Sequence, residues 1–170
     1  MMRIGLMSDT HSHVEDGIFK YFEEVDEIWH AGDIGDIAVM DTLEAFKPCR
    51  AVHGNIDHGV AKHTYPQDMR WDCEGLDVYM THIGGYPGRY NKRVYAQFMQ
   101  NPPKLFICGH SHILKVMPDK QFGFLLINPG ACGNHGFHAI KTITRFSVES
   151  GKVKDLEVIE LGKRGAIRSR

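Results

Sequence analysis

The chain has 170 residues, of which 42% are hydrophobic, and its formal net charge is −1. This length is enough for one domain with a buried core, and we expect a single domain over residues 1–170. The lack of a basic excess argues against stable nucleic-acid binding, and no apolar run reaches the roughly 18 residues of a membrane-spanning helix. The four cysteines form no Cys-x-x-Cys pair, so we expect free thiols and a cytoplasmic protein without a membrane partner.

The first third of the chain alternates between short apolar runs and amphipathic stretches. This pattern predicts strands at residues 3–8, 25–30 and 49–53, with helices between them at residues 14–24 and 37–46. A strand-helix alternation of this kind favours right-handed crossovers and a parallel sheet. In such a sheet, ligands bind at the carboxyl ends of the strands.

The remainder of the chain is dominated by strand patterns. We expect a hairpin at residues 68–73 and 76–81, and a helix at residues 91–99 that Pro102 and Pro103 terminate. Further strands are predicted at residues 105–108, 114–117, 122–128, 139–147 and 152–160, in a mostly antiparallel region. Two sheets with helices outside them account for this order.

Polar residues that can ligate a metal ion follow five of the predicted strands. They offer carboxylate or amide oxygens and imidazoles, without the thiolates of a structural zinc site. Such a donor set suits Mn²⁺, Zn²⁺ or Fe, and a carboxylate can bridge two cations. The predicted ligands are Asp9, His11, Asp33, Asn55, His82, His110 and His112, with Asp33 as the candidate bridge.

The charge of a two-metal site indicates what it attracts. Two dications, less two carboxylates and a bridging hydroxide, leave about one positive charge, which favours a phosphate group. The hydroxide then attacks phosphorus in line with the leaving group, and no serine or cysteine nucleophile is needed. We assign catalytic roles to Asp33, Asn55 and His82.

The motifs, taken in order, resemble those of the calcineurin-like metallophosphoesterase superfamily. The resemblance is to its small bacterial and archaeal phosphodiesterase branch, which also contains the retromer subunit Vps29. It implies a four-layer α-β-β-α sandwich of two mixed sheets. It also implies a first metal held by Asp9, His11, Asp33 and His112, and a second held by Asp33, Asn55, His82 and His110. The motifs that carry it are Asp9-x-His11, Gly32-Asp33, Gly54-Asn55, His82, Gly109-His110-Ser111-His112 and Asn128-Pro129-Gly130.

Two positions depart from the family pattern. Ile56 stands where many members carry a histidine that protonates the leaving group, although the small phosphodiesterase branch also lacks it. Loss of such general-acid help typically costs about 10²–10⁴-fold in rate. After His82 the chain continues Ile83-Gly84-Gly85, where relatives often have glycine followed by histidine, so a substrate-facing imidazole is absent from the sequence there.

Several other residues are open to two interpretations. Asp57 either orients a neighbouring ligand or caps a turn. His13 either meets substrate or lies in a solvated loop. His135 and His138 follow the Asn128-Pro129-Gly130 turn, which the fold implied by the resemblance returns to the site, so either is a candidate for substrate contact. His30 and His53 end strands on apolar backgrounds and are interpreted as packed or hydrogen-bonded residues. Three tyrosines either line the rim of the pocket or pack in the core and on a helix face: Tyr86, Tyr90 and Tyr95.

The sequence therefore predicts a dinuclear metal-dependent phosphodiesterase that acts on a small or nucleotide-like phosphate ester. Two divalent ions are expected, with Mn²⁺ first and Zn²⁺, Fe, Ni or Mg²⁺ as alternatives. A phosphomonoesterase on the same site and a non-catalytic metal-binding scaffold are the rival hypotheses. The oligomeric state is left open.

Overall fold

The computed structural model describes residues 1–165 and builds them into ten strands and four helices. The helices are α1 (Asp16–Tyr21), α2 (Ala38–Phe46), α3 (Gly59–Thr64) and α4 (Lys92–Gln100). The strands are β1 (Met2–Met7), β2 (Glu27–His30), β3 (Cys49–Ala51), β4 (Asp68–Cys73), β5 (Leu76–Thr81), β6 (Leu105–Ile107), β7 (Leu114–Pro118), β8 (Leu125–Pro129), β9 (Ile140–Glu149) and β10 (Lys152–Lys163). The end of the predicted domain, residues 166–170, lies outside the described residues.

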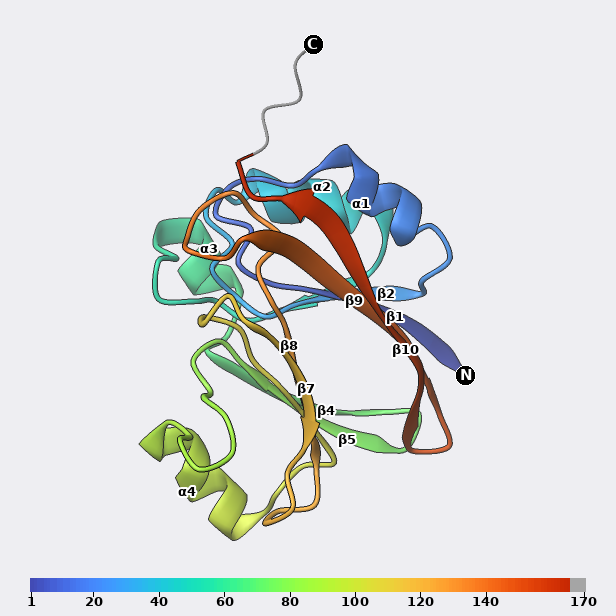
Figure 1. Cartoon of the computed structure of the whole chain (residues 1–170), viewed down its shortest axis with the longest axis vertical. Coiled ribbons are helices and arrows are strands. Elements are labelled where there is room, and N and C mark those ends of the chain that lie inside the picture. Colours follow the sequence, from blue (N-terminus) through green and yellow to red (C-terminus); the bar gives the residue numbers. More distant parts are fainter. Residues whose placement is uncertain (166–170) are drawn as a thin grey trace.

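The strands form two five-stranded sheets (Figure 1). The first has the order β10-β9-β1-β2-β3, and its β1, β2 and β3 are parallel, as the alternating pattern predicts. The second has the order β4-β5-β6-β8-β7. The expectation of a mostly antiparallel second half is wrong for the centre of this sheet, because β5, β6 and β8 run parallel. Helix α4 carries the chain from β5 across to β6, which makes this parallel pairing accessible.

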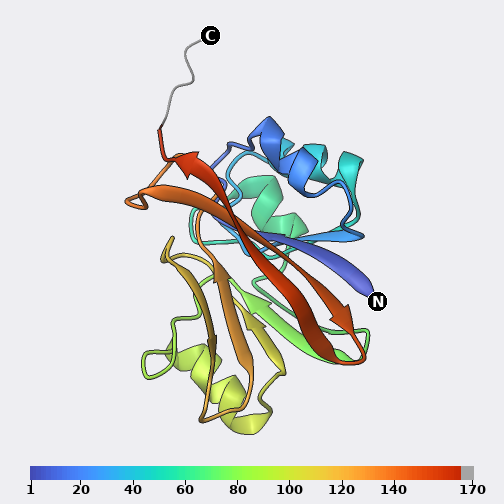
Figure 2. The same ribbon diagram turned by 45° about the vertical axis from the view of Figure 1, so that its right-hand side comes forward.

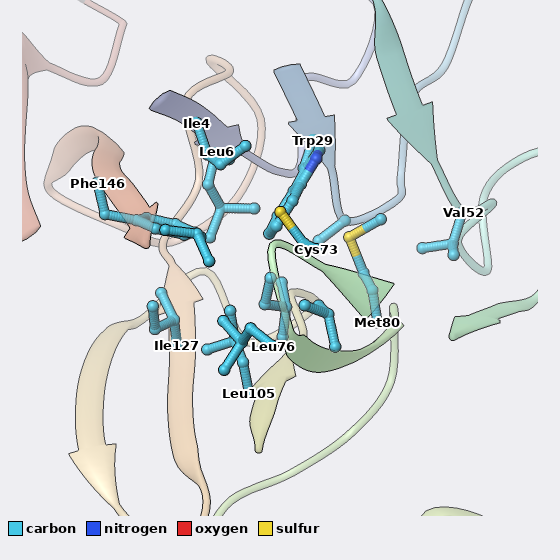
Figure 3. Close-up of a cluster of buried hydrophobic side chains, with 14 residues drawn as sticks. Ile4, Leu6, Trp29, Val52, Cys73, Leu76, Met80, Leu105, Ile127 and Phe146 are labelled. Carbon is cyan, nitrogen blue, oxygen red and sulfur yellow. The ribbon is translucent and has the colours of Figure 1, made fainter. Parts of the chain in front are cut away.

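The main hydrophobic core lies between the two sheets (Figure 3). Leu6 and Trp29 of the first sheet face Met80, Leu105 and Ile127 of the second, and all five are fully buried. Outward-facing residues of the central strands, such as Ile28 and Phe106, pack on helices, so the centre of each sheet is apolar on both faces.

Helices cover the outer face of each sheet (Figures 1 and 2). Ile18 of α1 and Leu43 of α2 belong to a cluster with Ile28 of the first sheet. Phe98 of α4 packs against Phe106 of the second sheet, with the two ring centroids 4.8 Å apart. The predicted α-β-β-α sandwich of two mixed sheets is therefore confirmed. None of the helices in the described part of the chain is long and apolar enough to cross a membrane.

Two helices differ from the sequence prediction. Helix α1 ends at Tyr21 because the chain turns after it, with the Val25 N–H donating to the carbonyl of Phe22. The sequence pattern places Phe22 in a longer helix, although it packs against the sheet from a non-helical segment. Helix α3 was not predicted, because its only buried residue is Ala61 and six residues show no apolar period.

Candidate metal centre

The seven predicted ligands meet at one edge of the sandwich, where β1, β2 and β3 of the first sheet and β5 and β6 of the second end. Two groups of donor atoms form there. In the first, donor atoms of Asp9, His11, Asp33 and His112 lie within 4.8 Å of one another. In the second, those of Asp33, His82 and His110 do. Asp33 belongs to both groups, and Asn55 joins the second through its Oδ1, 2.9 Å from His110 Nδ1.

The spacing of the donor atoms matches two adjacent coordination shells. His112 Nε2 lies 3.1 Å from Asp9 Oδ1, and His11 Nε2 lies 3.5 Å from Asp33 Oδ2. His82 Nε2 lies 3.2 Å from Asp33 Oδ1. Donor atoms about 2.0–2.2 Å from one ion, in tetrahedral or octahedral arrangement, lie about 3.0–3.5 Å apart. The distances between these donor atoms are therefore those expected between ligands of one metal ion.

Three of these atoms are buried and lack a hydrogen-bond partner in the described part of the chain: Asp9 Oδ1, His11 Nε2 and His82 Nε2. A buried polar atom without a partner typically costs about 1–3 kcal/mol, and more when it is charged. All three belong to the two donor groups just described, so one cation in each group would satisfy them. The residues present thus fit a pair of divalent ions.

The orientation of His82 is fixed by the backbone. Its Nδ1 lies 2.7 Å from the Ala31 carbonyl oxygen, which can only accept, so Nδ1 carries the hydrogen. The neutral ring then has its lone pair on Nε2, which faces Asp33 and Asp9. Hydrogen bonds of this kind on the far nitrogen orient metal-ligating histidines.

The two carboxylates are held by their non-ligating contacts. Asp9 Oδ2 accepts from the Ser8 hydroxyl at 2.7 Å and from the His110 N–H at 3.2 Å, which leaves Oδ1 for an ion. Asp33 Oδ1 accepts from the Ile56 N–H at 3.1 Å. The role of Ser8 was missed in the sequence, where only its place before Asp9 could have indicated it.

The loops that carry the ligands have an unusual backbone. A non-glycine residue with positive φ is uncommon and costs on the order of 1–3 kcal/mol, and such residues cluster at functional sites. These values persist here because backbone hydrogen bonds tie the loops together, as from the His11 N–H to the Asp33 carbonyl at 3.1 Å. The predicted ligands with positive φ are Asp9 (56°), His11 (45°), Asp33 (54°), His110 (71°) and His112 (59°).

Glycine is required beside Asp33 for reasons of space. A Cβ atom at Gly54 would lie 2.0 Å from Asp33 Oδ1. The Gly54-Asn55 pair therefore brings the loop after β3 directly against the candidate bridging carboxylate.

Asp57 joins the two ligand-bearing loops of the first sheet. It is buried, and its carboxylate accepts from the backbone N–H groups of Gly54 at 2.7 Å, Gly35 at 2.8 Å and Ile34 at 3.1 Å. These donors flank Asn55 in one loop and follow Asp33 in the other. Of the two interpretations of Asp57, the structure favours the orienting one.

Electrostatics differ among the candidate ligands. Burial lowers the pKa values of His11 and His110, which favours their neutral, ligating forms. Burial opposes the charge on His82, but the Asp33 carboxylate, with Oδ1 3.2 Å from its Nε2, and the charge of Asp9 outweigh this and raise its pKa. Burial alone would raise the pKa of Asp33, yet its close contact with His82, the His82 charge and the hydrogen bond from the Ile56 N–H together lower it.

The other histidines divide as the sequence indicated. His30 is fully buried and hydrogen-bonded to Thr10 and Gly32, and His53 Nδ1 lies 2.8 Å from the Tyr65 carbonyl. The loop after β8 returns to the site, where the His135 ring centroid lies 4.8 Å from that of His11. The His138 ring lies 5.1 Å from His112, and its Nε2 is hydrogen-bonded to the Gly133 carbonyl. His135 and His138 therefore border the candidate metal centre.

Comparison with known proteins adds a family to this geometry. The family model described as the calcineurin-like phosphoesterase superfamily domain matches residues 2–151. The chain belongs to this superfamily. The calcineurin-like phosphoesterase is 28% identical over 137 residues to a probable metallophosphoesterase of Methanothermobacter thermautotrophicus, covering 76% of the chain and 77% of the relative. It is 27% identical over 159 residues to another from Methanocaldococcus jannaschii, covering 87% and 77%.

Solved structures share the fold of this calcineurin-like phosphoesterase. A structure described as a novel archaeal phosphodiesterase superposes with a TM-score of 0.73 at 23% identity, covering 94% of this chain and 100% of that one. Vps29 from Entamoeba histolytica, in complex with Zn²⁺, gives a TM-score of 0.72 at 14% identity, covering 94% and 99%. The superfamily and the cluster of donors together make this a metallophosphoesterase with a candidate divalent-metal centre.

Proposed function

We propose that the protein is a metal-dependent phosphodiesterase with a dinuclear site. The observation that carries this proposal is the pair of donor groups that share Asp33 and contain three buried atoms without partners. When bound, two such ions supply positive charge for a phosphoryl group and lower the pKa of water toward neutrality. The side chains of the protein hold these ions and bind the substrate.

Each group of ligands has a distinct task. Asp33 belongs to both donor groups and would screen the repulsion between two bound ions, because only an anionic ligand is suited to a position between two cations. Asn55 and His82 would hold the second ion, and both line a cleft at the site. Neutral histidines contribute no charge, so two dications with two carboxylates keep a net positive site that attracts a phosphate ester.

Two clefts beside the second group of ligands favour a diester over a monoester. One cleft, of about 280 Å³, reaches His110, and the other, of about 170 Å³, reaches Asn55 and His82. Ile83 and Asn91 line both clefts and so stand between them. A phosphodiester carries two organic groups and can fill both clefts, whereas a monoester fills one. The structural neighbour described as an archaeal phosphodiesterase has the same fold.

The environment of Ile56 indicates which diesters react fastest. Ile56 is half-buried, and its N–H is directed at Asp33, so it brings no proton to a leaving group. The proposed enzyme therefore favours substrates whose leaving group is stable as an anion.

We further propose Mn²⁺ as the native ion and the cytoplasm as the compartment. Oxygen and imidazole donors without thiolate suit Mn²⁺, and the four cysteines are free thiols, three of them buried. The proposed partner is a small or nucleotide-like phosphate ester rather than a nucleic acid or a membrane.

The test is hydrolysis of bis(p-nitrophenyl) phosphate by Mn²⁺-loaded protein, with EDTA-treated protein and Asp33→Ala as controls. We expect turnover that needs metal and is lost in Asp33→Ala. A higher rate on p-nitrophenyl phosphate would instead indicate a phosphomonoesterase. Metal binding without turnover on either substrate would indicate a scaffold, and absence of metal binding would refute the site assignment.

A further inference from the structure

The larger of the two clefts has features that the metal centre does not explain. It lies between the loop that follows β5 and the segment that begins at His110, and β7 and β8 close its far side. Its volume of about 280 Å³ is near the lower end of small-molecule sites. His110 is both a candidate metal ligand and part of the lining of the cleft. A group bound in the cleft can therefore be attached to a phosphorus atom that lies at the metal centre.

The wall of the cleft is apolar and aromatic. Tyr86 is 40% exposed and Ile113 is 62% exposed, and both line the cleft. Gly85 also lines it, and the loop requires glycine there, because its φ is 90° and a Cβ atom would lie 2.3 Å from the Arg89 carbonyl oxygen. An exposed aromatic ring in a concave site offers a flat surface on which another ring can stack.

Among residues 1–165, two cationic side chains and no carboxylate line the same cleft. Lys115 Nζ lies 4.0 Å from the centroid of the Tyr86 ring, and Arg89 is exposed on the loop. Within residues 1–165, neither Lys115 nor Arg89 forms a salt bridge. The cleft is therefore positive, and its cations are available to acceptor atoms of a ligand.

A hydroxyl group in the cleft can act toward a ligand only as a donor. Ser111 Oγ accepts from the Ile113 N–H at 3.2 Å and from Asn128 Nδ2 at 3.1 Å, which uses both lone pairs. The amide of Asn128 is itself fixed, because its Oδ1 accepts from Gly130 and its Nδ2 also donates to the Gly109 carbonyl. The hydrogen of the exposed Ser111 hydroxyl is left for a ligand acceptor.

We propose that this cleft binds one organic group of the diester, and that this group is a planar aromatic ring with hydrogen-bond acceptors or negative charge. The inference rests on the proposed phosphodiesterase function and extends it to a substrate class. Tyr86 supplies the stacking surface, Lys115 and Arg89 supply the cations, and Ser111 supplies the donor. A stacked ring takes the face of Tyr86 that Lys115 now covers, and the flexible lysine moves to the acceptor atoms of the ring.

The experiment uses non-hydrolysable probes, so that it does not depend on turnover. Dibenzylphosphinate and dimethylphosphinate are titrated by calorimetry into Mn²⁺-loaded protein. We expect the dibenzyl probe to bind at least about tenfold more tightly (about 1.4 kcal/mol), since stacking on aromatic side chains is of this size or larger. Tyr86→Leu should remove about tenfold of this preference and leave dimethylphosphinate binding unchanged. The matched control is Tyr21→Leu, because Tyr21 is 37% exposed on α1, away from the cleft.

A second pair of variants tests the cations. A dibenzylphosphinate that carries a carboxylate on each ring should bind more tightly than the parent, and Lys115→Met should abolish this gain. Lys120→Met, at an exposed lysine outside the cleft, should keep it. A p-nitrophenyl ester of thymidine 5′-phosphate then separates the two sources of such a ring. Turnover faster than that of bis(p-nitrophenyl) phosphate identifies a nucleobase, and slower turnover a simple aryl group.

The outcomes separate the inference from the function on which it rests. Equal binding of the two parent phosphinates, or a preference that survives Tyr86→Leu, would overturn the inference even if the protein hydrolyses diesters. A preference that depends on Tyr86 in a protein without metal-dependent hydrolysis would refute only the proposed function. Failure of both probes to bind metal-loaded protein would overturn both.

Discussion

Replacement of Asp57 by asparagine tests how the candidate metal centre is held in place. The carboxylate accepts three backbone N–H groups, two at Oδ2 and one at Oδ1. An asparagine amide can keep one oxygen where Oδ2 lies and so retain the bonds from Ile34 and Gly54. Its NH₂ group then faces the N–H of Gly35, which is left without an acceptor.

The magnitude follows from these three bonds. A buried donor that loses its partner costs about 1–3 kcal/mol, and each remaining bond weakens when the acceptor is no longer charged. We therefore expect Asp57→Asn to lower the free energy of unfolding by about 3 kcal/mol, or the melting temperature by about 6–12 °C. Because the loops of Asp33 and Asn55 are tied through this carboxylate, metal affinity should also fall about 10–100-fold.

The assay is thermal and urea denaturation in EDTA, which removes the contribution of bound metal, followed by Mn²⁺ titration of the folded protein. Asp36→Asn is the matched control, since its exposed side chain accepts only from the Ala38 N–H. Asparagine serves equally well at such a position, so this control should change stability by less than about 0.5 kcal/mol. If Asp57→Asn behaves like the control in both measurements, Asp57 does not hold the two loops.

Three further perturbations have defined outcomes. His30 is buried with its Nδ1 accepting from the Gly32 N–H, and burial lowers its pKa from 6.5 to about 4. As pH falls, the unfolded chain takes up this proton first, so about 3 kcal/mol of stability, fully present above pH 6.5, is lost by pH 4. Glutamine at position 30 cannot titrate, so the free energy of unfolding of His30→Gln, measured by urea denaturation in EDTA, should fall by about 3 kcal/mol less between pH 6.5 and pH 4. Parallel plots of stability against pH for the two proteins would contradict this. Gly54→Ala places a methyl group against Asp33 and should abolish Mn²⁺ binding in calorimetry. The control Gly17→Ala has open space around it and should bind Mn²⁺ normally. Normal binding by Gly54→Ala would show that the Asp33 loop can move to accommodate the methyl group. Ile56→His should raise the rate on a methyl ester, a poor leaving group, at least about tenfold and leave the rate with p-nitrophenolate as leaving group nearly unchanged. An equal change on both substrates would argue against a missing general acid.

The parts of this fold that could be predicted are the elements with a clear hydrophobic periodicity and the polar residues that directly follow a strand. The spacing from Asp9 to His112 places each donor directly after an apolar run, and the ends of parallel strands in both sheets meet at one edge. The hairpin of β4 and β5 was predicted at its observed bounds, because the Glu74-Gly75 turn separates two alternating segments.

The remainder depends on contacts between distant loops. Nothing local to Asp57 records that its three donors come from residues on two loops, and nothing local to Lys115 records that Tyr86 lies beneath it. The parallel pairing of β6 with β8 was missed for a related reason. Strand β7 comes between them in the chain but takes the edge of the sheet.

The origin of the ligands also sets an order of events during folding. Each donor group draws on both sheets, since Asp9, His11, Asp33 and Asn55 follow strands of the first sheet, and His82, His110 and His112 follow strands of the second. Neither half of the chain alone holds a complete group, so an ion can be captured only after the two sheets have met. During synthesis, this requires residues beyond His112 to have left the ribosome. If the proposed assignment holds, the nascent chain cannot complete a donor group until more than half of it is made, and ions bound there would fasten the two sheets at their shared edge.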